Sequence, residues 1–387
     1  MEAERILLKK AAPGREFNVK GLAPVMRRVS ENSSLIIKLG SVGAMLAVMF
    51  LTSGTAAADE WKRDLLVLTS TNSASNDVVV FKLDTGGTPS LSLVSTLPTG
   101  GTGGASGNGG SLQFGEHLGA VVNYGSNNVS QVKRDGDFIQ VLGTISLAPN
   151  CVKPVSIALS ENHLFVVGAN CAESHAWPSG NVDGTVVALP DASAGQIAVG
   201  ESWAAVTLKS GSVLQLPLTK GGALNGTNVT VTLPNGANNT PLGAAFWGDI
   251  LGFNPAHSPD SFALVNENQS VFPVPGPQPQ YPTNAPCWLA KGPGSVWYSA
   301  NSPGQAISIF FSDSQGGVFY KSVPLPGTPT DITVSRDRNW LALIYTAADN
   351  TGGRVAIFAI DPYGDLSPVA TSDPIGVAAF SGVAISQ

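Results

Sequence analysis

The sequence predicts an all-β protein, a seven-bladed β-propeller, on three observations. Beyond residue 60, runs of four to seven residues rich in Val, Ile, Leu, Phe and Thr alternate with Gly, Asn, Asp, Ser and Pro. One short strand pattern returns at spacings of 41 to 51 residues. The last copy of this pattern stands at the C-terminus with nothing after it, whereas the first repeat unit has no such strand at its start. These features are typical of a ring of small sheets.

The recurring pattern predicts the innermost strand of each blade. Its copies are SLQFG at 111, SIALS at 156, IAVGE at 197, GAAFW at 243, CWLAK at 287, DITVS at 331 and GVAIS at 382. Variants of one hairpin, which predict the second and third strands, occupy residues 65–84, 119–135, 296–313 and 341–361. A repeat of this size with about four strands indicates a propeller blade.

The two ends of the chain are predicted to complete one blade together. The segment LLVLTSTN at 65 matches a second strand and has no first strand before it. The segment FSGVAISQ at the C-terminus supplies a first strand. Its pairing with residues 65–69 would close the ring and remove exposed sheet edges.

The N-terminal segment differs from the rest. Positive charge, including Lys9, Lys10, Arg27, Arg28 and Lys38, precedes an apolar run at 42–51, and Ala56-Ala57-Ala58 fits a cleavage site before Asp59. The apolar run is short for a bilayer span, so we interpret residues 1–58 as a leader with a signal peptide, an uncleaved anchor being the alternative. We expect an exported protein, periplasmic or secreted, whose propeller occupies residues 59–387.

The net charge of residues 59–387 limits the kinds of partner that this part of the chain can bind. Residues 59–387 hold 13 Lys and Arg against 23 Asp and Glu, with no basic stripe. We expect no nucleic acid partner, because phosphate binding needs clustered positive charge. No C-x-x-C, H-E-x-x-H or D-x-D-x-D-G motif occurs, so we expect neither a metal nor another cofactor.

Six segments, taken in their order along the chain, resemble the lactonase-type seven-bladed propellers. This family includes 6-phosphogluconolactonase-like and 3-carboxymuconate cyclase-like proteins. The segments that carry the resemblance span residues 99–114, 120–137, 153–170, 240–246, 285–290 and 328–335. The resemblance implies a hydrolase or cyclase that acts on a lactone-type small molecule. It specifies a fold family and no particular reaction.

Substrate-binding residues are expected where loops surround one mouth of the channel. These loops enter the innermost strands or leave the second strands, and such concave mouths gather side chains from several blades. The candidates are Asn123, Lys153, Asn170, Asn284, Asn301 and Asp331. For the recurring Asn residues the plainer interpretation is a turn role, since Asn tolerates left-handed backbone.

Residues 171–184 (CAESHAWPSGNVDG) are predicted to form a long loop that holds the catalytic pair. His175 and Glu173 lie two residues apart, so the pair could act as a general base on water that attacks a lactone carbonyl. A solvated surface loop is the alternative.

Two cysteines are predicted to form a disulfide. Cys151 and Cys171 each lie ten residues from a turn near Glu161, so they would face each other across a hairpin. Export makes oxidation plausible. Cys287 then remains a free thiol, interpreted as a buried structural residue at the start of the innermost strand of blade six, with Trp288 as packing between blades.

Two hypotheses of function follow. The first is an exported lactonase-like hydrolase or cyclase that needs no metal, with its site at the channel mouth. The second is a non-catalytic propeller that binds a small molecule or a protein in the cell envelope or outside the cell. We expect a monomer with no membrane span in the mature chain.

Overall fold

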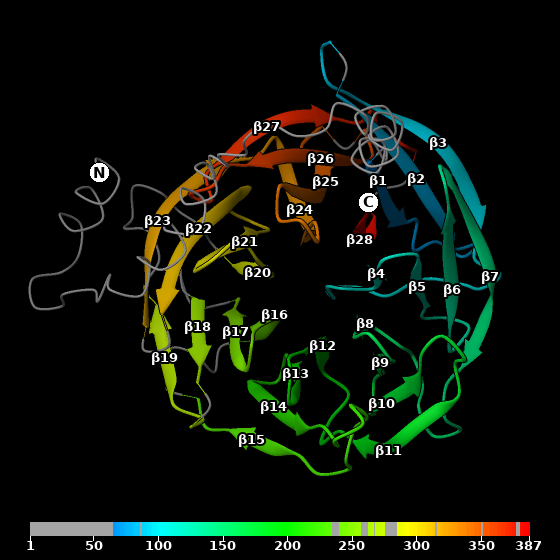
Figure 1. The fold of residues 1–387 in the computed structure, drawn as a ribbon, viewed down its shortest axis with the longest axis vertical. Coiled ribbons are helices and arrows are strands. Elements are labelled where there is room, and N and C mark those ends of the chain that lie inside the picture. Colours follow the sequence, from blue (N-terminus) through cyan, green and yellow to red (C-terminus); the bar gives the residue numbers. More distant parts are fainter. Residues whose placement is uncertain are drawn as a thin grey trace, which may run out of the picture. The chain divides into compact units, whose positions relative to one another are not determined.

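The computed structural model describes residues 65–387, apart from 86, 234–239, 257–261, 267, 275–284, 314–315, 350 and 377–379. The expected leader therefore lies outside the described residues. Within them, seven four-stranded antiparallel sheets follow one another around a central axis (Figure 1). The predicted seven-bladed β-propeller is confirmed.

Each blade is numbered here from the N-terminus, and its strands are counted outward from the axis. The innermost strands of blades one to seven are β28 (Ser381–Ser386), β4 (Leu112–Phe114), β8 (Ser156–Leu159), β12 (Ala194–Val199), β16 (Pro241–Trp247), β20 (Pro286–Lys291) and β24 (Gly327–Val334). The second strands are β1 (Leu65–Ser70), β5 (Leu118–Asn123), β9 (His163–Val167), β13 (Trp203–Leu208), β17 (Ile250–Pro255), β21 (Val296–Asn301) and β25 (Trp340–Ala347). All seven predicted innermost strands are confirmed.

The outer half of each blade is a second hairpin. The third strands are β2 (Asp77–Asp84), β6 (Asn128–Asp135), β10 (Cys171–Ala176), β14 (Ser212–Pro217), β18 (Phe262–Val265), β22 (Ala306–Asp313) and β26 (Gly353–Ile360). The outermost strands are β3 (Ser90–Pro98), β7 (Phe138–Ser146), β11 (Val182–Ala188), β15 (Val229–Val231), β19 (Val271–Val274), β23 (Gly316–Pro324) and β27 (Leu366–Thr371).

This strand order gives the ring two faces. The top face carries the loops that lead into the innermost strands and the loops that leave the second strands. The bottom face carries the turns that leave the innermost strands. Each innermost strand therefore runs from top to bottom, and its position along the channel can be read from residue number.

The C-terminal strand closes the ring. β28 pairs antiparallel with β1, with Leu68 opposite Ala384 and Thr69 opposite Val383. The Thr69 hydroxyl adds a bond of 2.7 Å to the carbonyl of Gly382. This pairing confirms the predicted closure and gives the edge of β1 its missing partner.

Both faces of β1 are buried because adjacent blades cover both sides of each sheet. Successive strand residues point to opposite faces. Val67 packs with Ile344 of blade seven, whereas Leu66 and Leu68 pack with Val121 of blade two. This arrangement explains why the second strands read as continuous apolar runs instead of clean alternations.

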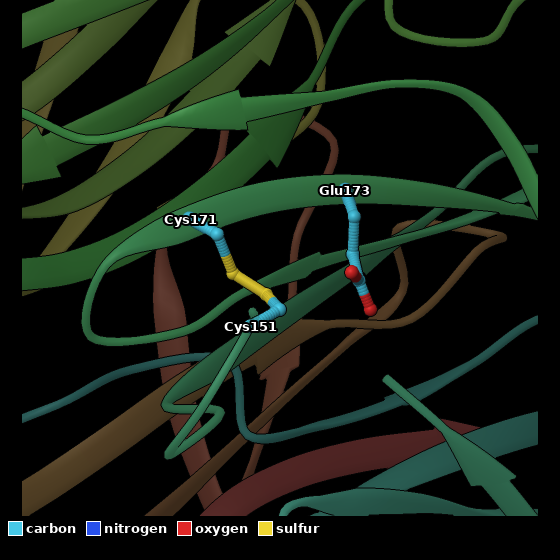
Figure 2. Close-up of side chains that lie close together, drawn as sticks. All are labelled: Cys151, Cys171 and Glu173. Carbon is cyan, nitrogen blue, oxygen red and sulfur yellow. A yellow bond between two sulfur atoms is a disulfide. The ribbon is translucent and has the colours of Figure 1, made fainter. Parts of the chain in front are cut away.

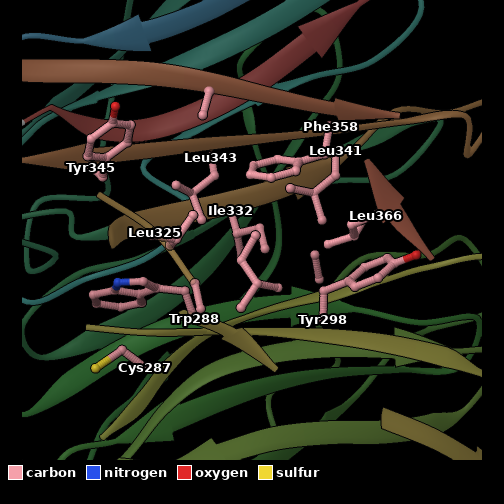
Figure 3. Close-up of a cluster of buried hydrophobic side chains, with 14 of the residues drawn as sticks. Cys287, Trp288, Tyr298, Leu325, Ile332, Leu341, Leu343, Tyr345, Phe358 and Leu366 are labelled. Carbon is pink, nitrogen blue, oxygen red and sulfur yellow. The ribbon is translucent and has the colours of Figure 1, made fainter. Parts of the chain in front are cut away.

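The interface between blades six and seven shows the same packing (Figure 3). Trp288 and Tyr298 of blade six pack with Leu343 and Phe358 of blade seven. Trp288 is 5% exposed, which places it in the core as expected. Cys287 is buried in the same cluster, and its thiol donates to the carbonyl of Ala285 over 3.1 Å.

Residues 171–184 are not a loop, which corrects the expectation. β10 takes Cys171–Ala176, and β11 begins at Val182, with a five-residue turn between them. In β10 the inner pairing to β9 sets Glu173 opposite Val166 and His175 opposite Leu164. Polar residues enter a strand here because their side chains find partners inside the blade, which a hydrophobicity pattern cannot reveal.

Candidate ligand channel

The glycine-rich segment before β4 closes the top end of the channel. Asn108 donates its amide to the carbonyls of Ala194 and Gly195 in blade four, at 3.0 and 3.2 Å. Gly110 donates its N–H to Oδ2 of Asp331 in blade seven at 2.8 Å, and its carbonyl accepts from Ile157 of blade three at 2.8 Å. Two residues, Asn108 and Gly110, thus contact three blades across the axis.

Glycine is needed in this plug because neighbouring side chains leave no room. A Cβ on Gly109 would lie 2.8 Å from a ring carbon of Trp288 and 2.9 Å from Oε1 of Gln196. Gly110 has a φ of +66°, where a side chain adds strain. We define residues 108–110 as the plug.

A cavity of about 230 Å³ lies below the plug. It begins at Gly110 and is lined by the lower halves of the innermost strands of blades two to seven. Most of the lining residues are apolar in type, with Leu159, Val199, Phe246 and Val334 near the lower strand ends, but the surface that faces the cavity is more polar than apolar. Its polar lining consists of Gln113, Gln196, Lys291, Asp331 and Thr333.

Exposure increases along the cavity from the plug to the bottom face. In β24, Asp331 and Ile332 are buried, whereas Thr333 and Val334 are half-buried. In β16, Ala244 is buried, Phe246 is half-buried and Trp247 is exposed. The channel is therefore blind at the plug and meets solvent at the bottom face.

Asp331 stands at the blind end. A register shift in the β24–β25 pairing falls between Pro329 and Asp331, and bulges of this kind redirect side chains. The carboxyl accepts backbone N–H bonds from Gly110 and Ile332, at 2.8 and 2.9 Å, and a further one from Val383. Burial nevertheless raises the pKa of this carboxyl to about 7.

Lys291 lies at the other end, in the last position of β20. Its ammonium donates to the carbonyls of Gly292 and Val296, at 2.9 and 3.2 Å, and also to the carbonyl of Gly294. The nitrogen sits 5.0 and 5.2 Å from the ring centroids of Trp247 and Trp297. Burial and the nearby Arg338 lower the pKa of Lys291 to about 7.

Two predicted binding residues are buried within blades. Asn123 is 0% exposed, and its amide donates to Asn128 and Ser130, both at 2.7 Å. Its Oδ1 accepts from Asn76 and Thr99, at 2.9 and 2.7 Å. An amide offers two donors and two acceptor sites, so no capacity is left for a ligand.

Asn301 has a similar environment in blade six. It is 0% exposed, accepts from the Ser299 hydroxyl and donates to the Ser308 hydroxyl, both at 2.8 Å. Asn123 and Asn301 each end a second strand and are not in left-handed turns. The turn interpretation holds instead for Asn72, whose φ is 51°.

Of the other described binding candidates, Asp331 lines the channel and Asn170 and Lys153 do not. Asn170 braces the top-face loop of blade three, accepting from Val152 N–H at 3.2 Å and donating to the Asn150 carbonyl at 2.6 Å. Lys153 is exposed in the same loop, with a φ of 52°. Asn284 lies outside the described residues.

Glu173 and His175 do contact each other. Nε2 of His175 lies 2.8 Å from Oε1 of Glu173, and both side chains are 0% exposed. Nδ1 of His175 faces the carbonyl of Gly180 at 2.9 Å, so it must donate. The Glu173 carboxyl also accepts from Ala148 N–H at 3.0 Å. The pair is thus hydrogen-bonded inside blade three, and neither residue lines the channel.

The predicted disulfide joins Cys151 to Cys171, with Cα atoms 5.4 Å apart (Figure 2). The route differs from the expected one. The β8–β9 ladder begins at Ser156 opposite Val167, so Cys151 lies in the loop before β8 and Cys171 opens β10. Glu173 lies beside the bridge, with donor atoms within 4.8 Å. The bridge engages both sulfur atoms, which leaves this trio without thiolate ligands.

Sequence reasoning missed Gln113, Gln196, Phe246 and Lys291 as cavity residues. They lie in the innermost strands or at their lower ends, whereas the search was directed to top-face loops. The available signal was the position within each innermost strand, because later residues lie nearer the bottom face.

No protein-family model matches the chain, and no curated protein sequence matches it. None of the described residues belongs to a helix whose length and apolar character suit the crossing of a membrane.

Several solved structures resemble this one at low sequence identity. A "putative 6-phosphogluconolactonase" from Bacteroides fragilis matches with a TM-score of 0.60 and 12% identity, over 84% of this chain and 99% of that one. Virginiamycin B lyase from Staphylococcus aureus gives 0.50 and 11%, over 84% and 99%. Hydrazine synthase from Kuenenia stuttgartiensis gives 0.51 and 11%, over 80% and 94%. At these identities the likeness shows the fold alone.

Proposed function

We propose that this propeller is a binding protein that takes a small molecule into its channel from the bottom face and does not convert it chemically. The observation that supports this proposal most strongly is the cavity of about 230 Å³ that ends blindly at Gly110. Ligand sites are commonly concave and furnished with a few well-placed polar groups. A volume below the usual range of about 300–1,000 Å³ favours a small ligand.

The chemistry of the lining supports binding over catalysis. No His or Cys lines the cavity among the described residues, and Asp331 is its single carboxyl group. Three backbone N–H groups already hold that carboxyl to the plug, to β24 and to β28. We therefore assign Asp331 first to anchoring the plug and second to contacting a ligand.

Glu173 and His175 suit a structural role better than the catalytic one. Activation of water requires a free imidazole nitrogen at the substrate. Here both ring nitrogens of His175 are engaged, one by Glu173 and one by Gly180. We propose that the pair fixes the outer hairpin of blade three next to the disulfide.

Lactone hydrolysis is the second candidate function. Its support is the pKa of Asp331, raised to about 7, which suits a general base at neutral pH. The fold it shares with the Bacteroides fragilis protein agrees with this candidate. In this reading Asp331 would activate water in the channel.

We also propose that residues 59–387 are the mature, exported form and that it is a monomer. The Cys151–Cys171 bridge supports export, because disulfides persist in oxidising compartments. N-terminal sequencing of the protein from cell fractions tests this, with Asp59 expected first and the protein expected outside the cytoplasm. A cytoplasmic protein that begins at Met1 would overturn it.

Calorimetric titration with benzyl alcohol tests the binding function. The wild type should bind one equivalent. Ala245→Trp should weaken binding at least tenfold, because Ala245 is half-buried and lines the cavity. Ala188→Trp is the control, since Ala188 is exposed on outer strand β11. Equal binding by all three proteins would reject the channel.

A screen on γ-butyrolactone and dihydrocoumarin separates the two candidates. We expect no turnover above that of the denatured protein. Turnover that is lost in Asp331→Asn and kept in His175→Ala would establish the hydrolase instead. Turnover that is lost in His175→Ala or Glu173→Ala in a folded protein would favour the catalytic pair.

A further inference from the structure

We propose that the channel prefers an organic cation, a small ammonium group on an apolar body, and that Asp331 is its counter-ion. This inference rests on the binding function proposed above and adds the chemical class of the ligand. The observation behind it is a buried carboxyl group, at the blind end of the cavity, that has no cationic partner.

Asp331 is 3% exposed and lines the cavity. Among the described residues, no Lys, Arg or His forms an ion pair with it. Its partners are the backbone N–H groups of Gly110, Ile332 and Val383. A buried ionised carboxylate without an opposite charge is costly, so a ligand that brings a positive charge gains more here than a neutral one.

The carboxyl group keeps room for a ligand. An ionised carboxylate offers about four acceptor sites, and three backbone donors use three of them. One site remains, which suits a single N–H of an ammonium group. Charge-assisted bonds of this kind are about twice as strong as neutral ones.

The surroundings of Asp331 suit the rest of the ligand. Gln113 and Gln196 line the same cavity. Oε1 of Gln196 already accepts from Ala244 N–H at 3.2 Å and keeps one acceptor site for a further ammonium hydrogen. Phe246 and Val334, which are half-buried near the bottom face, can pack against an apolar body. A ligand with its charge at the plug and its apolar body toward solvent would match this order.

Lys291 is the other ionisable residue that lines the cavity among the described residues. Its nitrogen donates to the carbonyls of the 292–296 turn and lies near two indole rings. Arg338, nearby, donates to the carbonyl of Gly292 in that turn. The positive charges at the bottom face thus have acceptors of their own, whereas Asp331 has no cation.

A charge series on the mature protein tests the preference. Benzylammonium, benzyl alcohol and benzoate have similar shapes and differ in charge, and each is titrated calorimetrically at pH 8, where Asp331 is ionised. We expect benzylammonium to bind at least tenfold more tightly than benzyl alcohol, and benzoate most weakly. Asp331→Asn should abolish the cation preference while benzyl alcohol still binds, since an Asn oxygen can still accept from Gly110.

Asp337→Asn is the matched control. Asp337 lies in the turn after β24, is exposed and does not line the cavity, so this variant should keep the full preference. Equal binding of cation and alcohol by the wild type overturns the inference, even if Asp331→Asn fails to fold. A preference that survives in Asp331→Asn also overturns it. Absence of binding by all three probes would instead reject the channel as a site.

Discussion

Gly110 donates its backbone N–H to Oδ2 of Asp331 over 2.8 Å, although 221 positions separate the two residues. This bond joins the plug to blade seven. It also brings a carboxyl group to the blind end of the cavity, where burial raises its pKa to about 7. The same hydrogen bond therefore closes the channel and places an ionisable group at its closed end.

Asp331 should make stability depend on pH between about 4 and 7. Its folded pKa is raised from 3.8 to about 7, so the folded protein binds the extra proton in that window. The stabilisation is complete below pH 4 and is lost as pH rises to 7, by up to about 4 kcal/mol. Urea unfolding of the wild type against Asp331→Asn should give a difference that varies in this window. A constant difference would contradict the raised pKa.

Lys291 should make the stability of the protein depend on pH in a different, more alkaline range. Its folded pKa is lowered from 10.5 to about 7, so the unfolded state binds more protons between these values. Stability attributable to Lys291 should therefore rise with pH from 7 to about 10. Lys291→Met should remove this rise while leaving the Asp331 window intact. A rise that persists in Lys291→Met would show that another group causes it.

Glu173→Gln and His175→Ala should each destabilise the protein. Both side chains are 0% exposed, and loss of one member of a buried pair leaves an uncompensated group, at a cost of about 3–5 kcal/mol. The double variant should cost less than the sum, because the two residues share one interaction. Chemical denaturation measures all three proteins. Strict additivity would mean that the pair does not interact.

Reduction of the Cys151–Cys171 bridge should lower stability by about 3 kcal/mol, the entropic expectation for a loop with a separation of 20 residues. Thermal unfolding with and without dithiothreitol measures the loss, and Cys151→Ser/Cys171→Ser should reproduce it. Cys287 controls for thiol effects, because burial keeps this thiol protonated and raises its pKa. Peptide mapping that finds both Cys151 and Cys171 alkylated without reduction would refute the bridge.

Removal of residues 381–387 should leave the ring open. β1 would lose its partner strand, and Leu68 and Val67 would lose the contacts with Ala384 and Ile385. An exposed apolar edge promotes aggregation. We expect loss of cooperative unfolding and association into larger species, measured by denaturation and light scattering.

The control is deletion of the outermost strand β27. Its effect on stability and association should be smaller, because this strand is only partly buried. A monomeric, cooperatively folded protein without β28 would contradict closure.

The architecture could be predicted because the repeat and the orphan strands are local features of the sequence. Each innermost strand carries its own apolar run, and the unmatched segments at 65 and 382 left one pairing that closed the ring. The disulfide was predicted for similar reasons, although its residues join a loop to a third strand and not the two sides of one hairpin.

The site could not be predicted in the same way because it depends on contacts between distant blades. The glycine-rich segment gave no sign that Gly110 would reach Asp331 across the axis. Because the top end is closed, the cavity opens at the bottom face. Its lining residues are therefore strand residues such as Phe246 and Gln196, and not the Asn residues of the top-face loops. The amide groups of Asn123 and Asn301 are consumed within their blades, which sequence spacing does not reveal.

A crystal structure of the mature protein with benzyl alcohol tests the central claim most directly. The account predicts one molecule below Gly110, with its ring beside Phe246 and its hydroxyl toward the Asp331 end of the cavity. Density for the alcohol on the top face, or at sites outside the channel only, would contradict it.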